Sequence, residues 1–266
     1  MTEQPSSGNP FNRITAIAGN TFREAIRDRV LYNLIVFVLL IVASAILLGE
    51  LTNGQEARTI VNIGLNAMLI FGTFIAIFVG VGLVSKEIEK RTVFNIFSKP
   101  VGRGEFVVGK FLGLCLTLLV NTLVMGVGVS LALLYVGDRS LAATVWPAIF
   151  LIYFELIITT AAAILFSSFS TPALSALLTF FVFIIGHMSA SLRDLASGMN
   201  SRPAAAFLEA IYFVLPNLSL FSFRTEAANQ LVPSTTMLGY AVLYSVLYCS
   251  VVLAASIIVF SRRNFK

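Results

Sequence analysis

Charged residues are scarce in this chain: they make up 12% of its 266 residues, against about 25% in ordinary soluble domains. Histidine occurs once, at His187, and cysteine twice, at Cys115 and Cys249. A single histidine excludes an HExxH zinc site, and the two cysteines lack the spacing of a metal site. The G-x-S-x-G elbow of many hydrolases is also missing. The sequence therefore carries no recognisable metal centre or hydrolase active site.

Long hydrophobic runs dominate the sequence instead. The chain is 58% hydrophobic, and a helix needs about 20 apolar residues to cross about 30 Å of hydrocarbon. Because lipid offers no partner to an unpaired backbone group, such runs are expected to be helices. We predict an all-α polytopic membrane protein: a disordered cytoplasmic tail over 1–12, then one transmembrane domain over 13–266. Its six predicted spans are Leu31–Leu48, Ile63–Val84, Phe111–Val136, Val145–Phe166, Ala173–Ser189 and Leu238–Phe260.

The net charge of +5 indicates orientation in the membrane, and no nucleic-acid partner is expected. With six spans and both ends on one side, thirteen of the eighteen Lys and Arg residues fall on that side. The positive-inside rule then predicts a plasma (inner) membrane protein with both termini cytoplasmic. The five basic residues left on the outer side are Arg58, Arg139, Arg193, Arg202 and Arg224.

Two segments outside the spans have helical patterns. Over 13–30, apolar residues recur at spacings of three and four, which predicts an amphipathic helix lying in the membrane interface. The alternative is a cytoplasmic extension of the first span. Over 190–237, Ser201-Arg-Pro203 opens a short helix that ends before Pro216. This extracytoplasmic helical segment is expected to lie on, or dip into, the outer leaflet.

Few polar side chains fall inside the predicted spans. Glu155 lies nearest mid-depth, where a charge costs about 2.5–3.5 kcal/mol, so its side chain is expected to face the bundle interior. Asn121 should lie at similar depth and is its predicted partner. The pair is either a polar spot on a translocation path or a hydrogen bond that packs spans three and four together. His187, near the outer end of span five, is expected to be an interfacial side chain.

The cytoplasmic loop Ser85–Lys110 combines six of the eighteen basic residues with large apolar side chains, which is typical of a docking site. The alternative is that its aromatic residues lie in the inner interface while its charges hold orientation. Gly104–Lys110 matches seven places of the phosphate-binding loop GxxxxGK[ST], but Phe111 in the eighth cannot bind magnesium. We therefore predict no nucleotide site here. Gly109 and Gly113 form a GxxxG spacing, which favours close helix packing.

The order of these parts resembles the permease subunits of ABC-2 type transporters. Within the loop, EKRTVFNIFSKPVGRGEFVVGK is similar to the family pattern of charged pair, apolar helix and Pro-Val-x-Arg-x-Glu before span three. The later stretch LPNLSLFSF resembles the subgroup with the nitrous-oxide-reductase maturation and gliding-motility permeases. The resemblance implies that a coupling loop, 85–106, binds a partner through Glu87, Glu89, Lys90, Arg91, Val93, Phe94, Phe97, Pro100, Arg103 and Glu105.

The resemblance further implies a half-transporter, most simply of an exporter. Two copies, or one copy and a related subunit, would form the channel in the lipid bilayer, and a separate ABC-type ATPase would bind ATP and Mg²⁺. This chain itself is expected to hold no cofactor and no metal, and to catalyse no reaction. A different class of function stays open: a non-transporting membrane anchor or scaffold that recruits a cytoplasmic partner.

Overall fold

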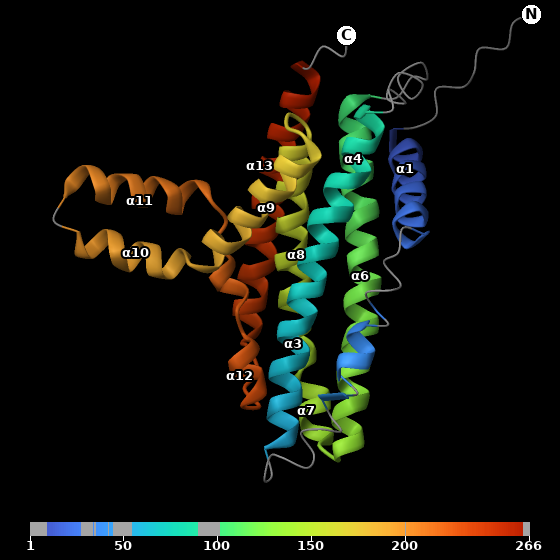
Figure 1. The fold of residues 1–266 in the computed structure, drawn as a ribbon, viewed down its shortest axis with the longest axis vertical. Coiled ribbons are helices and arrows are strands. Elements are labelled where there is room, and N and C mark those ends of the chain that lie inside the picture. Colours follow the sequence, from blue (N-terminus) through green and yellow to red (C-terminus); the bar gives the residue numbers. More distant parts are fainter. Residues whose placement is uncertain are drawn as a thin grey trace, which may run out of the picture.

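The structure is a computed structural model that describes residues 10–27, 34, 36–41, 43, 44, 55–89, 102–199 and 201–262. All regular elements among these residues are helical, which confirms the prediction of an all-α polytopic membrane protein. Most of them run along one long axis and form an upright bundle (Figure 1). The elements are α1 (Pro10–Ala25), α3 (Glu56–Phe74), η2 (Ile75–Val79), α4 (Gly80–Glu89), α6 (Arg103–Val136), α7 (Arg139–Thr144), α8 (Trp146–Ser167), α9 (Pro172–His187), α10 (Ser189–Gly198), α11 (Arg202–Val214), η3 (Leu218–Phe221), α12 (Arg224–Ala228) and α13 (Thr235–Arg262).

Among the residues that the structure describes, four helical stretches are long and apolar enough to cross a membrane alone: Glu56–Leu83, Arg103–Val136, Arg139–Ser167 and Thr235–Arg262. They contain four of the predicted spans almost completely. The predicted first span, Leu31–Leu48, falls largely outside the described residues, although residues 34, 36–41, 43 and 44 within it are helical.

The predicted fifth span is broken. Its helix α9 ends at His187, and α10 continues at an angle of 64° to it. At 1.5 Å per residue, the 16 residues of α9 measure about 24 Å, less than the hydrocarbon thickness. Ala173–Ser189 is therefore not one straight span. A second bend, of 50°, separates α11 from the segment Leu218–Ala228.

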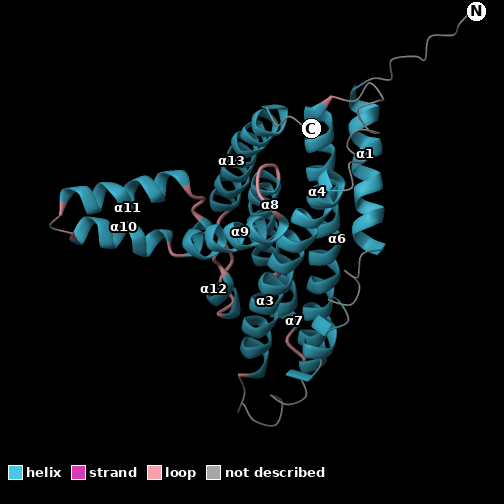
Figure 2. Ribbon diagram, turned by 45° about the horizontal axis from the view of Figure 1, so that its top comes forward, coloured by secondary structure: helices cyan, strands magenta, loops and turns pink. Residues whose placement is uncertain are grey.

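The segment 190–237, predicted to be extracytoplasmic, contains the short helix that its prolines predicted. α11 begins at Arg202 with proline in its first turn and ends at Val214, just before Pro216. Together with α10 it forms a hairpin that projects sideways from the bundle (Figure 1), and the tilted view of Figure 2 shows the same projection. η3 and α12 then lead back along the bundle to α13.

Two groups of buried apolar residues hold the upright helices together. One joins α3, α6, α7 and α8 and includes Leu65, Met68 and Leu156, each fully buried. The other joins α6, α8 and α13 and includes Phe106 and Phe260, whose rings stack with centroids 5.8 Å apart. Helix α8 contributes to both groups and is the central element of the bundle.

Helix α1 packs along the first turns of α6 instead of across them. Arg13 of α1 pairs with Glu105 of α6 at 3.4 Å, and Lys110 of α6 pairs with Glu24 of α1 at 3.6 Å, so the two helices run in parallel. The place of this helix in the membrane interface stays a prediction; the structure adds that α1 lies along α6. The 34-residue length of α6, about 51 Å, leaves a part beyond the hydrocarbon for α1 to cover.

The α1–α6 contact depends on Gly109 and Gly113. A Cβ atom at Gly109 would lie 2.7 Å from the side chain of Ile17. One at Gly113 would lie 2.6 Å both from the carbonyl oxygen of Ala18 and from Cβ of Thr21. Side chains at either position would force α1 away from α6, so the two glycines set the distance between these helices.

We predict that Gly113→Ala destabilises the protein by about 1–3 kcal/mol, because the new methyl group meets the backbone of α1, which cannot rotate away. The measurement is thermal unfolding of the purified protein in detergent. Gly239→Ala on α13 is the matched control, since nothing lies within 4 Å of a Cβ atom there. Equal unfolding temperatures for the two variants would contradict close α1–α6 packing.

Candidate functional site

One end of the bundle carries both helices that flank the predicted coupling loop. α4 ends at Glu89 and α6 begins at Arg103, both at the end where α13 also terminates (Figure 1). Glu87 and Glu89 belong to the last turn of α4, but their side chains lie outside the described part of the chain. The same is true of the whole of the following loop residues Lys90, Arg91, Val93, Phe94, Phe97 and Pro100.

The two loop residues that the structure does describe connect the loop's end to other helices. Glu105 accepts a hydrogen bond from the backbone N–H of Gly102 at 3.0 Å, which caps α6, and it pairs with Arg13 of α1. Arg103 donates to the carbonyl oxygens of Phe260, at 3.4 Å, and Ser261, at the end of α13. A displacement of the loop's second end would therefore pull on α1 and α13 together with α6.

Gly104–Lys110, the segment that matches seven places of the phosphate-binding loop pattern, forms the first turns of α6. Lys110, at its end, is buried with 4% exposure. Its ammonium group pairs with Glu24 and stands 5.8 Å from the ring centre of Phe106. Lys110 thus contributes to the contact between α1 and α6.

A buried ionic cluster lies in the middle of the bundle. Glu155 of α8 is completely buried, with one carboxylate oxygen 2.8 Å from Nε2 of His187 and the other 3.8 Å from Nη1 of Arg224. These four facing atoms are buried and have no hydrogen-bond partner among the described residues, so the two ion-pair contacts are the compensation that the structure gives them. Nδ1 of the same ring lies 3.1 Å from the carbonyl oxygen of Phe183, which a doubly protonated imidazole would satisfy.

The cluster replaces the pairing that the sequence predicted. Asn121 donates its amide N–H to the carbonyl oxygen of Thr117, one turn back on α6, at 2.8 Å. Its carbonyl oxygen has no hydrogen-bond partner among the described residues. The prediction that Asn121 pairs with Glu155 is wrong, because the two carboxylate oxygens of Glu155 face His187 and Arg224 instead.

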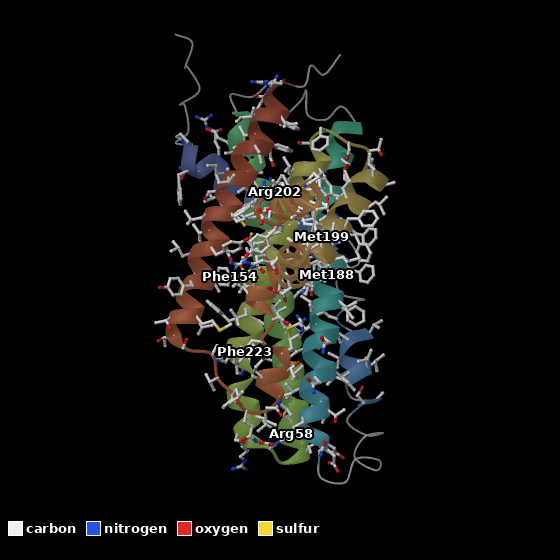
Figure 3. The ribbon with its side chains drawn as sticks, turned by 90° about the vertical axis from the view of Figure 1, so that its left-hand side faces the viewer. Arg58, Phe154, Met188, Met199, Arg202 and Phe223 are labelled. Atoms are coloured by element: carbon white, nitrogen blue, oxygen red, sulfur yellow. The ribbon has the colours of Figure 1, made fainter. Side chains whose placement is uncertain are left out.

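The depth of the cluster follows from its place on α8. Glu155 lies nine residues after Trp146 and twelve before Ser167, or about 14 Å and 18 Å from the two ends of the helix. Figure 3 places its neighbour Phe154 level with Met188, the residue at the end of α9, near mid-height of the bundle. α9 therefore stops beside Glu155, half-way through the bundle.

The two chain breaks meet at this depth. A Cβ atom at Gly186, near the end of α9, would lie 2.8 Å from the carbonyl oxygen of Pro216, where α11 gives way to η3. The hydroxyl groups of Ser189 and Ser219 both donate to the side-chain oxygen of Asn217, and the backbone N–H of Asn217 donates to Tyr244 of α13. Polar groups freed by the breaks are thus paired inside the protein, as hydrocarbon requires.

An open groove of about 510 Å³ lies between the helix that carries α3 and η2 and the neighbouring α9. Its lining is apolar except for the hydroxyl group of Thr73, which has no hydrogen-bond partner among the described residues. The groove can accept an apolar or amphiphilic molecule. Its lining residues are Ile70, Thr73, Phe74, Ile77, Phe78, Ala173, Ala176, Leu177, Phe180 and Phe183.

Comparison with known families gives a match over almost the whole chain. Residues 15–265 match the family model described as ABC-2 family transporter protein. The chain belongs to the ABC-2 transporter family. This ABC-2 family member is accordingly a multi-pass membrane protein and a permease subunit of an ABC transporter, a transport component rather than an enzyme. A search of curated proteins finds no match to this ABC-2 permease.

Sequence reasoning missed two members of the ionic cluster of this permease. Arg224 was counted among the outer charges, and His187 was assigned to the interface. The available signal was the free-energy cost of placing the carboxylate of Glu155 at mid-depth, because such a cost calls for a buried cation nearby. What hid the two residues is the broken backbone, which places both ends of the α10–α11 hairpin at the depth of Glu155.

We predict that Glu155→Gln lowers the free energy of unfolding by about 3–5 kcal/mol, because it leaves buried cations without their counter-charge. Adding Arg224→Gln to this variant should cost less than the sum of the two single substitutions, since it removes one of those cations. Thermal unfolding of the four proteins measures this coupling.

Glu226→Gln, on the same short helix as Arg224, is the control for that cycle and should leave stability nearly unchanged. Unchanged stability of Glu155→Gln, together with a loss of transport after reconstitution, would contradict the packing role. It would instead assign Glu155 to a translocation path.

Proposed function

We propose that this ABC-2 permease is half of an exporter, driven by a separate ABC-type ATPase that docks on the cytoplasmic loop 85–106. ATP and Mg²⁺ would bind to that partner chain. A second permease subunit, either another copy or a related chain, would complete the channel. The export direction and the placement near the nitrous-oxide-reductase maturation and gliding-motility permeases rest on the resemblance of the loop and of LPNLSLFSF.

One geometric observation carries the coupling proposal. A single helical rod, Glu56–Glu89, ends at the coupling loop and forms one wall of the apolar groove in its middle. Movement of the loop would therefore reach the groove through one continuous element. The groove side of this rod includes Ile77 and Phe78 of the π-helical segment η2, and π-helical turns are often found at functional sites.

The other end of the loop supports the same proposal. Arg103 and Glu105 tie it to α13 and α1, so a partner that moves the loop would act on several helices at once. The apolar side chains of the loop leave no obvious surplus of free energy for docking: burying Val93, Phe94, Ile96 and Phe97 would contribute about 6–12 kcal/mol at about 1.5–3 kcal/mol each. Association itself costs about 4–15 kcal/mol, so the charges of the loop are needed as well.

Orientation in the inner membrane, with both termini and the loop in the cytoplasm, is part of the proposal. It is supported by the thirteen basic residues that this arrangement places inside. The apolar lining of the groove favours a cargo with apolar surface.

We predict that Phe94→Asp combined with Phe97→Asp abolishes co-purification of the ATPase that accompanies the wild-type protein. Charged side chains cannot occupy the apolar contact that the loop offers. The measurement is the ATPase activity retained with the affinity-purified permease. Leu231→Asp, an exposed position between α12 and α13 at the opposite end of the bundle, should leave it unchanged. Full ATPase binding by the loop variant would exclude this docking site.

We also predict that Lys99→Cys is labelled by a membrane-impermeant maleimide only after the cells are permeabilised. Arg139→Cys, exposed in the short outer helix α7, should be labelled on intact cells. The two native cysteines are buried and provide a low background. Labelling of Lys99→Cys on intact cells would overturn both the orientation and the docking proposal.

A further inference from the structure

The α10–α11 hairpin, residues 189–214, has almost no support from its own chain. Helix α11 packs on α10 and buries none of its residues. The hairpin projects sideways from the bundle in both views of Figures 1 and 2. Large apolar side chains on it are widely exposed: Phe207 by 66%, Phe213 by 80% and Val214 by 72%.

Both ends of the hairpin join the bundle at mid-depth. Its first residue, Ser189, follows the end of α9 beside Glu155, and its exit at Pro216 contacts Gly186 of the same helix. The hairpin therefore leaves and re-enters the bundle within the thickness of the hydrocarbon, about 14–18 Å from the ends of α8.

The charges of the hairpin make lipid a poor surrounding for it. Arg193, Asp194, Arg202 and Glu209 are all exposed. Arg193 stands 6.0 Å from the ring centre of Tyr212, and the other three form no ion pair with any residue in the described part of the chain. Charged side chains at membrane depth are expected to face protein or water instead of lipid.

We propose that this hairpin packs against a second copy of the same chain. Two basic and two acidic side chains give the hairpin no net charge, so two copies related by a two-fold axis can neutralise each other's charges. The exposed aromatic residues of α11 supply the apolar part of the contact, as in the cores of other subunit interfaces. The inference rests on the proposed pair of permease subunits and identifies the element that joins them.

Native mass spectrometry of the detergent-purified protein tests the contact. The wild-type chain should be found as a pair, and the combination of Phe207→Asp and Phe213→Asp should reduce the paired fraction at least tenfold. The matched control is Tyr135→Asp: Tyr135 is 81% exposed at the outer end of α6, against 80% for Phe213. The control should remain paired. A hairpin variant that pairs as well as the wild type overturns the proposal.

A second measurement does not depend on the stability of a charged variant. Trp146 is the single tryptophan of the chain, so Trp146→Phe with Phe213→Trp places one fluorophore on the hairpin. In bilayers that contain brominated acyl chains, this fluorophore should be quenched at least threefold less than one introduced by Tyr240→Trp. Tyr240 is 74% exposed on α13. Equal quenching at the two positions would mean that the hairpin faces lipid, and would overturn the proposal.

The proposal for the hairpin contact and the proposal for docking at the coupling loop can be tested independently. Loss of pairing in the hairpin variant while the ATPase still co-purifies would support the hairpin contact. Intact pairing in that variant, with the ATPase bound, would overturn the hairpin contact and leave the proposed function standing. A paired wild-type protein that binds no ATPase, but whose hairpin variant is unpaired, would count against the proposed function alone.

Discussion

The buried carboxylate of Glu155 is the interaction on which the middle of this protein depends. A charge at that depth is tolerated only with cationic partners, and the chain supplies them from two distant places, His187 and Arg224. Those partners come within reach only because the backbone turns aside after α9 and returns before α12. The ionic cluster therefore depends on the two breaks that flank the projecting hairpin.

The apolar helices were predictable because a run of about 20 apolar residues is a strong indication of a helix that crosses the membrane. Four spans, the short helix before Pro216 and the all-α class follow directly from the sequence. The fifth span was not predictable in detail, since Ala173–Ser189 has the composition of a complete span while its helix stops at His187. Likewise, α1 shows the periodicity of an interfacial helix, and only the closeness of Gly109 and Gly113 to Ile17 and Thr21 reveals α6 as its support.

The candidate site was likewise predictable in part from the sequence. Composition predicts a docking surface at the loop 85–106, and the described end of the loop, Arg103 and Glu105, contacts helices that no sequence pattern links to it. Glu155 was recognised because a carboxylate at mid-depth in the membrane has a high free-energy cost. Asn121 was predicted as its partner because the two residues lie at similar depth on neighbouring spans. Which side chains pair depends on the directions in which they point from their two helices. The spacing of residues along the chain does not give these directions.

The broken fifth helix also has a consequence for synthesis in the membrane. Below the end of α9, the bundle is continued by α12, which packs on α3 and α7 (Figure 1). Arg224 follows Glu155 by 69 residues in the chain. A nascent chain that has inserted α8 can pair Glu155 with His187 once α9 is made, but the second cationic partner, Arg224, arrives only after the ribosome has added the hairpin. Completion of the ionic cluster in this permease thus depends on late-synthesised residues, because a chain that ends before Arg224 lacks the second partner of Glu155.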